Sequence, residues 1–476
     1  YRCILQLKDF GGTMSKIKRF LSTSGTYFIG SVLSKLIAFF LLPLYTSNFS
    51  PEEFGMYDLV VTIVSFFAPI AFFQIWDGMF RFSFDKQKTN EKYSIITNSF
   101  SVMVLGLIIY SLVFGIMYKV FDFDYAWLVY FYGILIAIQY QYTFISRSFL
   151  KNNLFVMSGL INSILNAGIN VLLITKFNFG IESLYIAFIL GSITQVLIIE
   201  AKLHPLRNFN FNKLNMKLQL DMIKFSLPLC VAAVSYWMLS GYTKVVISQQ
   251  LGNNANGLFA VASKFTSMIA ILITVFQYAW NEMAYLMVDD ENRLVKYQKS
   301  IEYIFKVVVI GSGIFLLFIK IIFPHFINST YHEALMIIPL SLIGVAANAF
   351  ANFVGTIFMA EKKTKWIFWT TLIASGINII CLWIFTPVWG LQGAVGALCL
   401  SFVTLIAIRL NRIWKMFNIK LPYSLIVYIL MLSVVVLIFF TVDSIFMLFI
   451  FIVILCGIAV YSVRDILILF FRFNNK

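Results

Sequence analysis

Long apolar runs, joined by short connectors, follow one another along almost the whole sequence. About 20 apolar residues in an α-helix cross the roughly 30 Å hydrocarbon core of a bilayer, and a bilayer excludes irregular backbone that contacts lipid. The chain is only 12% charged, against about 25% for soluble domains. The sequence therefore predicts an all-α polytopic membrane protein with fourteen transmembrane helices. The expected spans are residues 22–47, 56–80, 95–119, 126–149, 155–176, 182–203, 221–249, 257–284, 300–322, 333–359, 365–386, 391–414, 422–441 and 445–470.

The basic residues predict how these spans are oriented across the membrane. Most lysines and arginines lie in the N-terminal region and in the connectors after the even-numbered spans. Cytoplasmic loops retain Lys and Arg, so both termini are expected in the cytoplasm. The net charge of +15 is therefore a topology signal, and no nucleic-acid partner is expected.

An internal repeat relates the two halves of the chain. "FGMYDLVVTIVSFF" (54–67) resembles "NGLFAVASKFTSMI" (256–269), and "AGINVLLITKFNFGIES" (167–183) resembles "SGINIICLWIFTPVWGLQG" (375–393). The offset of about 200 residues contains six spans, an even number, so both copies have the same orientation. This predicts two parallel six-helix lobes, followed by two C-terminal helices.

The expected division of the chain follows from the spans and the repeat. Residues 1–13 precede the first methionine, Met14, and Gly11-Gly12 is what a translated ribosome-binding sequence would encode. We expect a non-native extension at 1–13, an N-lobe at 14–203 (spans 1–6), a cytoplasmic linker at 204–220, a C-lobe at 221–416 (spans 7–12) and the last two helices at 417–476.

Three of the lysines inside apolar runs are candidates for a substrate cavity. Lys35, in "GSVLSKLIAFFLLPLYTSNFS" (30–50), lies near the middle of the expected span 22–47. A charge there costs roughly 2.5–3.5 kcal/mol on insertion scales and usually marks a pathway or a pair. Lys244 and Lys264 are expected about 10 Å inside spans 7 and 8, where snorkelling to the interface is the alternative. A buried ion pair is the alternative for Lys35.

An acidic and a basic residue share one helix face at the cytoplasmic end of span 2. Asp77 and Arg81 are four residues apart, the spacing of a same-face ion pair. A structural pair is one interpretation. The other places Arg81 at the mouth of a cavity, where an anionic headgroup would enter.

Amides and a hydroxyl form ladders within spans 4 and 5, and side chains that recur every four residues share a helix face. These residues are Gln139, Thr143, Asn162, Asn166 and Asn170. Unsatisfied polar groups avoid lipid, so the ladders predict inward faces that contact a sugar or join neighbouring helices.

Enzymatic and metal-binding patterns are missing from the sequence. The histidines and cysteines lack metal-ligand spacing, and there is no Walker motif. A membrane enzyme that acts outside the bilayer would need a long outer loop, but the longest outer connector is "FPHFINSTYHEA" (323–334). We therefore expect no enzyme activity and no cofactor, with coupling to a proton or sodium gradient as a possible energy source.

Three stretches resemble Wzx-type polysaccharide (O-antigen) flippases of the multidrug/oligosaccharidyl-lipid/polysaccharide exporter superfamily. "SKLIAFFLLPLYTSNFSPEEFGMYDLV" (34–60) is similar to the family's first two helices, "FRFSFD" (80–85) to its Arg-aromatic element and "VVISQQLGNNANGLFAVASKF" (245–265) to its segment 7–8 hairpin. The chain has Thr243-Lys244 where members commonly carry an acidic-basic dipeptide, so a coupling role for a carboxylate there does not carry over.

The resemblance implies a V-shaped MATE-like fold that lies in the bacterial cytoplasmic (inner) membrane and works by alternating access. It implies a substrate of undecaprenyl-pyrophosphate-linked oligosaccharide, moved from the inner to the outer leaflet for O-antigen, capsule or exopolysaccharide synthesis. Membrane lipids and the polymerase and chain-length proteins of the same pathway are the implied partners. The residues carried over as headgroup contacts are Lys35, Arg81, Lys244 and Lys264.

The charges inside the spans favour this function over a related one. Up to three lysines without a carboxylate near the midplane suit a diphosphate. A MATE-type multidrug exporter of organic cations, the alternative in the same fold, should carry an intramembrane Asp or Glu. A membrane polysaccharide polymerase or ligase, the alternative of another class, should carry a longer outer loop than residues 323–334.

Overall fold

The computed structural model describes residues 32–84, 86–120, 124–286, 288, 290–363, 365–419 and 425–474, with side chains of the last helix described to residue 462. All regular structure in these ranges is helical. The expected extension at 1–13 and the first part of span 1 lie outside the described residues. The all-α prediction is confirmed.

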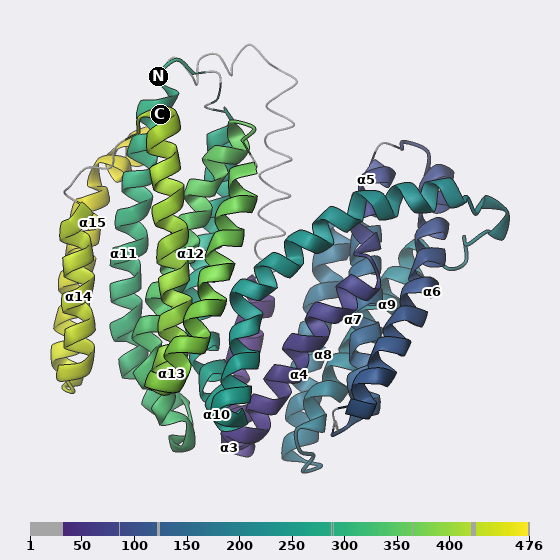
Figure 1. Ribbon diagram of the computed structural model, residues 1–476, viewed down its shortest axis with the longest axis horizontal. Helices are drawn as coiled ribbons and strands as arrows, with labels where there is room; N and C mark the ends of the chain where they lie inside the picture. Colours follow the sequence, from purple (N-terminus) through teal and green to yellow (C-terminus); the bar gives the residue numbers. More distant parts are fainter. Residues whose placement is uncertain are drawn as a thin grey trace. The chain divides into compact units, whose positions relative to one another are not determined.

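The helices follow the chain as a series of long rods (Figure 1). The first described helix is Val32–Asn48, and α3 is its second part. The elements are α3 (Leu42–Asn48), α4 (Pro51–Ala71), α5 (Ile75–Phe84), α6 (Thr89–Val120), α7 (Ala126–Ser148), α8 (Asn152–Thr175), α9 (Glu182–Leu203), η2 (Phe211–Lys213), α10 (Met216–Leu286), α11 (Arg293–Phe326), η3 (Ser329–Ile337), α12 (Ile338–Ala360), α13 (Lys365–Phe417), α14 (Leu425–Thr441) and α15 (Ile445–Asn474).

Two of the longest helices each contain a sharp break at a glycine. Gly252 in α10 has φ 86° and Gly390 in α13 has φ 57°, values that glycine adopts without the steric cost of a Cβ. In the described residues, ten helices are long and apolar enough to cross a bilayer, and two shorter apolar helices accompany them. Since α10 and α13 each hold two spans, these helices provide the fourteen that the sequence predicts.

Span 2 differs from its expected form, because it breaks at residues 72–74 instead of running from 56 to 80. Pro69, which has no N–H, lies in the last turn of α4. Phe73 and Gln74 then adopt φ values of 57° and 44°, and the Gln74 N–H donates to the Pro69 carbonyl at 2.8 Å. The chain restarts as the short helix α5.

The helices form two compact units. The first contains the chain up to Leu44 and Val60–Val234, and the second contains Tyr45–Leu59 and the chain from Ser235 onward. Helices α4 and α10 therefore each contribute to both units. The expected division into lobes at 14–203 and 221–416 stays a prediction.

The core of the first unit forms around α5. Ile75 and Met79 are completely buried there, against side chains of α6, α7, α9 and the start of α10. A Cβ on Gly78 would lie 2.8 Å from both the Met222 carbonyl oxygen and the Ser226 Oγ. The Gly78 N–H donates to that same Oγ at 3.1 Å, so glycine permits the contact between α5 and α10.

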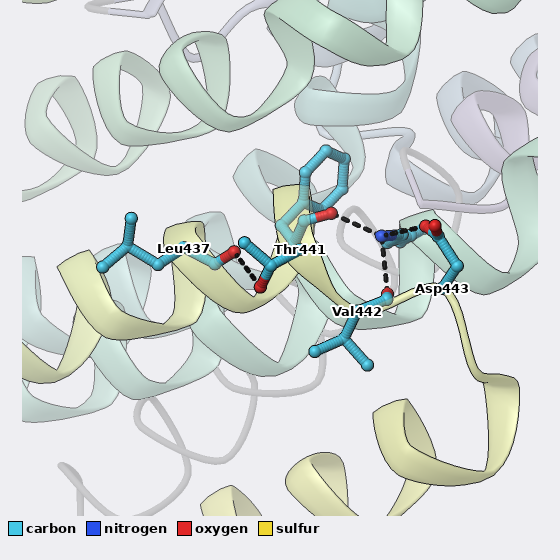
Figure 2. A network of polar contacts seen from close by, with 6 residues as sticks. Leu437, Thr441, Val442 and Asp443 are labelled. Carbon is cyan, nitrogen blue, oxygen red and sulfur yellow. Dashed lines mark hydrogen bonds and ion pairs between the residues drawn. The ribbon is translucent and has the colours of Figure 1, made fainter.

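In the second unit, α14 and α15 pack against α11. A lysine of α11 bonds to the C-terminal end of α14 (Figure 2). Lys320 of α11 donates to the carbonyl oxygens of Phe439 at 2.5 Å and Val442 at 2.6 Å, and lies 3.0 Å from Asp443 Oδ1. These are C-terminal carbonyls without partners inside the helix, and the helix dipole also favours a cation there. Lys320 is thus a helix cap.

Candidate anionic-headgroup site

A capping box fixes the start of α4 and so positions the first residue of the site. The Ser50 N–H and hydroxyl both donate to Glu53 Oε2 at 2.8 Å, and the Glu53 N–H donates back to Ser50 Oγ at 3.3 Å. Pro51 occupies the first helical position, where its missing N–H costs nothing. The sequence Ser-Pro-Glu-Glu therefore sets where α4 begins, two turns before Asp58.

A close backbone contact holds this helix start against α10 within the second unit. A Cβ on Gly55 would lie 1.9 Å from the Asn253 carbonyl oxygen, and one on Gly257 would lie 1.9 Å from the Pro51 carbonyl oxygen. Asn256 Nδ2 donates to the Gly55 carbonyl at 2.7 Å. No side chain larger than hydrogen fits at either glycine in this arrangement.

This contact brings a carboxylate to one of the predicted lysines. Lys244 Nζ lies 2.7 Å from Asp58 Oδ2, and the side chains are 20% and 10% exposed. Because the pair is largely buried, removing either partner would deprive the other of its nearest opposite charge. Lys244 therefore has its own counterion, contributed by α4.

Hydrogen bonds also hold the α10 turn that carries Lys244. Asn378 Nδ2 of α13 donates to the Leu239 carbonyl at 3.0 Å and to Thr243 Oγ1 at 3.4 Å. Thr243 and Asn378 are completely buried. The helix is thus attached to α13 on one face, next to the residue that pairs with Asp58.

Lys264 lies after the Gly252 break, and its side chain is exposed. Asp58 attracts and Lys244 repels the Lys264 ammonium, so the three charges act on one another within the second unit. Counted together they carry one net positive charge. A site of this kind attracts an anion while its own repulsion is partly offset.

The other predicted cations lie in the first unit. Lys35, in the helix Val32–Asn48, is exposed, as is Arg81 on α5. Asp77, four residues before Arg81, is half-buried, and Arg147 of α7 attracts it electrostatically. Arg147 in turn lies 5.1 Å from the centre of the Phe80 ring. Asp77 thus lies within reach of a basic residue on a neighbouring helix.

The predicted polar ladders take part in a network among α7, α8 and α9. Gln195 Oε1 accepts from Gln139 Nε2 at 2.6 Å and from Asn162 Nδ2 at 3.0 Å. A Cβ on Gly191 would lie 2.3 Å from Asn162 Oδ1. Glycine at position 191 therefore leaves room for the Asn162 side chain.

Further along α8, Asn170 Nδ2 donates to the Asn166 carbonyl and Oδ1 at 2.9 and 3.0 Å. Thr143 is half-buried on α7. Contact of these five residues with a sugar stays a prediction.

Two residues of these arrangements escaped the sequence reasoning. Asp58 is not among the predicted site residues, yet it and Lys244 lie at similar depths, about two turns from Pro51 and Gly252 respectively. That matching depth of opposite charges was the available signal. Gln195 lies in span 6, where polar residues do not recur every four positions. No sequence pattern therefore pointed to Gln195 as the acceptor that Gln139 and Asn162 share.

Comparison with protein families assigns the sequence to one of them. A family model described as "Polysaccharide biosynthesis protein" matches residues 21–281. No curated protein matches the sequence.

Solved structures share the fold. The lipid II flippase MurJ in an inward closed conformation is similar with a TM-score of 0.71 at 18% identity, covering 94% of this chain and 100% of that one. An inward-facing MATE multidrug resistance transporter of the MOP superfamily gives 0.64 at 13% identity, covering 84% and 95%. A MOP superfamily transporter from Pyrococcus furiosus, described as having a binding pocket of reverse polarity, gives 0.58 at 13% identity, covering 87% and 95%.

Proposed function

Because the chain belongs to the polysaccharide biosynthesis protein family, and is a multi-pass membrane protein with a flippase-like and MATE-like fold, we propose that it flips a lipid-linked oligosaccharide. The substrate is an undecaprenyl-pyrophosphate-linked repeat unit that moves from the inner to the outer leaflet by alternating access. The product serves the assembly of a surface polysaccharide. The observation that carries the proposal is the cationic site made by Lys244, Lys264 and Asp58.

The charge of this site suits a diphosphate. Lys264 is exposed and Lys244 is paired with Asp58. An anion that enters the site therefore contacts the Lys264 ammonium directly, and Lys244 exchanges the Asp58 carboxylate for the anion. Lysine is a compact point charge on a flexible stem, which allows Lys244 to turn from the carboxylate to a phosphate oxygen without moving its helix. Asp58 then acts as the resident counterion of the empty site.

Lys35 and Arg81 are proposed as further contacts of the substrate. The amide network around Gln195 is proposed to offer Gln139, Thr143, Asn162, Asn166 and Asn170 to the sugar. The membrane potential, negative inside, assists outward movement of an anion by roughly 2.3 kcal/mol per charge per 100 mV. Coupling to a proton or sodium gradient is compatible with this scheme.

A second candidate function is the export of organic cations. Asp58 favours it, because this carboxylate is 7% exposed within a transmembrane helix. The ion pair weighs against it: a cationic drug would have to displace Lys244 from Asp58 and then lie beside Lys264.

Reconstitution tests the proposal. Purified protein in liposomes without ATP should translocate a fluorescent undecaprenyl-pyrophosphate-linked oligosaccharide to the opposite leaflet. The Lys264→Gln variant, checked for folding by its elution volume and thermal unfolding, should be at least about tenfold slower, a loss of about 1.4 kcal/mol. Transport of an organic cation but not of the lipid-linked sugar would support the second candidate.

A further inference from the structure

An apolar cavity of about 520 Å³ lies between α10 and α11 in the second unit. Ile269 and Ile273 of α10 line one wall, and Phe353 of α12 contributes to the lining from a third helix. On α11 the lining runs from Tyr303 to Phe318, so the cavity follows the helix for roughly 22 Å at 1.5 Å per residue. It is a long groove rather than a rounded void.

The groove has a closed base and open rims. Ile269, Val308 and Phe353 are buried, whereas Phe276 and Phe318 are 56% and 49% exposed. In the middle of the α11 wall, a Cβ on Gly311 would meet nothing within 4 Å. The absence of a side chain at Gly311 therefore keeps the groove open.

The position of the groove on transmembrane helices limits what can fill it. Except for the Tyr303 hydroxyl, its lining side chains are hydrocarbon. Apolar cavities stay dry and take up apolar ligands, and the apolar ligand that surrounds these helices is lipid. A hydrocarbon chain that lies along α11 satisfies the lining without burying any polar group.

The groove faces away from the cationic site. Lys264 and Ile273 lie nine residues apart on one continuous stretch of α10, about 2.5 helical turns, so their side chains leave opposite faces. A substrate whose headgroup contacts Lys264 has this helix between its headgroup and the groove. This favours a resident membrane lipid over the chain of the transported lipid.

One end of the groove carries positive charge. Lys299 and Lys296 precede Tyr303 by about one and two turns of α11, which is 34 residues long. At about 51 Å this helix exceeds a hydrocarbon core of roughly 30 Å, so its first turns project into the headgroup region. Lys296 bonds to Asp290. Lys299 is exposed, and among the described residues no carboxylate pairs with it.

From this combination we infer that the groove is a binding site for an anionic phospholipid. One acyl chain lies along Gly311 between α10 and α11, and the phosphate meets Lys299 beyond Tyr303. The lipid would fill the space between the two helices as a bound structural component. This inference does not rest on the proposed transport function.

Native mass spectrometry of the full chain, titrated with phosphatidylglycerol and with phosphatidylcholine, tests the inference. The wild type should retain phosphatidylglycerol in preference to phosphatidylcholine. Gly311→Leu should lose most of this binding, and Gly311→Ala, whose methyl group meets open space, should fold and lose part of it. Gly115→Leu is the matched control, because a Cβ at Gly115 of α6 also meets nothing within 4 Å.

The charged end is tested separately. Lys299→Gln should weaken phosphatidylglycerol binding about fivefold, equivalent to the roughly 1 kcal/mol that a lysine contributes near an anionic surface, and should leave phosphatidylcholine unaffected. Lys202→Gln, an exposed lysine in the last turn of α9, is its control. Equal lipid retention by Gly311→Leu and Gly115→Leu would overturn the inference. So would undecaprenyl phosphate displacing phosphatidylglycerol from the wild type, because the groove would then hold the chain of the transported lipid.

Discussion

The carboxylate of Asp58 lies 2.7 Å from the ammonium of Lys244, and this pair joins the start of α4 to α10 inside the second unit. From the sequence, Lys244 is predicted to be a cavity cation in spans that carry no carboxylate near the midplane. The pair changes that interpretation, because one of the two predicted cavity lysines of α10 has a carboxylate as its counterion. Lys264 then supplies the net positive charge of the site.

Breaking the Asp58–Lys244 pair from one side should destabilise the protein more than removing both charges. Asp58→Asn or Lys244→Met alone leaves one largely buried charge, which costs about 3–5 kcal/mol in buried pairs. Asp58→Asn combined with Lys244→Met removes both charges and should recover most of that loss. Thermal unfolding in one detergent, run on all four proteins, measures the coupling. Additive losses in the double variant would mean that the two groups do not interact.

A methyl group at Gly257 should not be tolerated in the present arrangement of α4 and α10. The new Cβ would lie 1.9 Å from the Pro51 carbonyl oxygen, which is backbone, so Gly257→Ala should destabilise by about 1–3 kcal/mol. Gly115→Ala, with open space at its Cβ, should be neutral or slightly stabilising. If both variants melt at the wild-type temperature, the close contact does not exist in the folded protein.

Lys320→Met should loosen the terminal helix pair. The variant keeps the length of the side chain but deletes the donor to the Phe439 and Val442 carbonyls, and such charge-assisted bonds contribute about 1–3 kcal/mol. Hydrogen exchange should therefore speed up around residues 437–443, while α12 keeps its protection. Asp443→Asn should have little effect, because Asp443 is 94% exposed. Unchanged exchange in Lys320→Met would show that packing alone holds α14.

Much of the fold follows from sequence because span length and apolarity are local properties. The bilayer fixes how long an apolar helix must be, so the number of spans could be counted even where Gly252 and Gly390 leave almost no loop. The break at Phe73 and Gln74 was less predictable. It places two residues other than glycine in the left-handed region, and Pro69 alone permits either a kinked or a broken helix.

The candidate site was less accessible to sequence reasoning, because it depends on contacts between distant segments. Lys244 and Lys264 stand out as charges within apolar runs. The partner of Lys244 lies in a different helix, and it is the two glycines at positions 55 and 257 that bring that helix close. The sequence positions of these glycines relative to Asp58 do not predict the ion pair unless the contact between α4 and α10 is already known. The same holds for Gln195, whose two donors come from α7 and α8.

The most direct test of the account compares how two single variants bind the substrate. Binding of an undecaprenyl-pyrophosphate-linked oligosaccharide to purified protein should weaken in Lys264→Gln, which removes the available cation. It should tighten in Asp58→Asn, provided that the variant is folded, because Lys244 no longer has a competing counterion. Opposite shifts are the predicted result. Weaker binding in both variants, or no change in either, would contradict an anionic-headgroup site at Lys244 and Lys264.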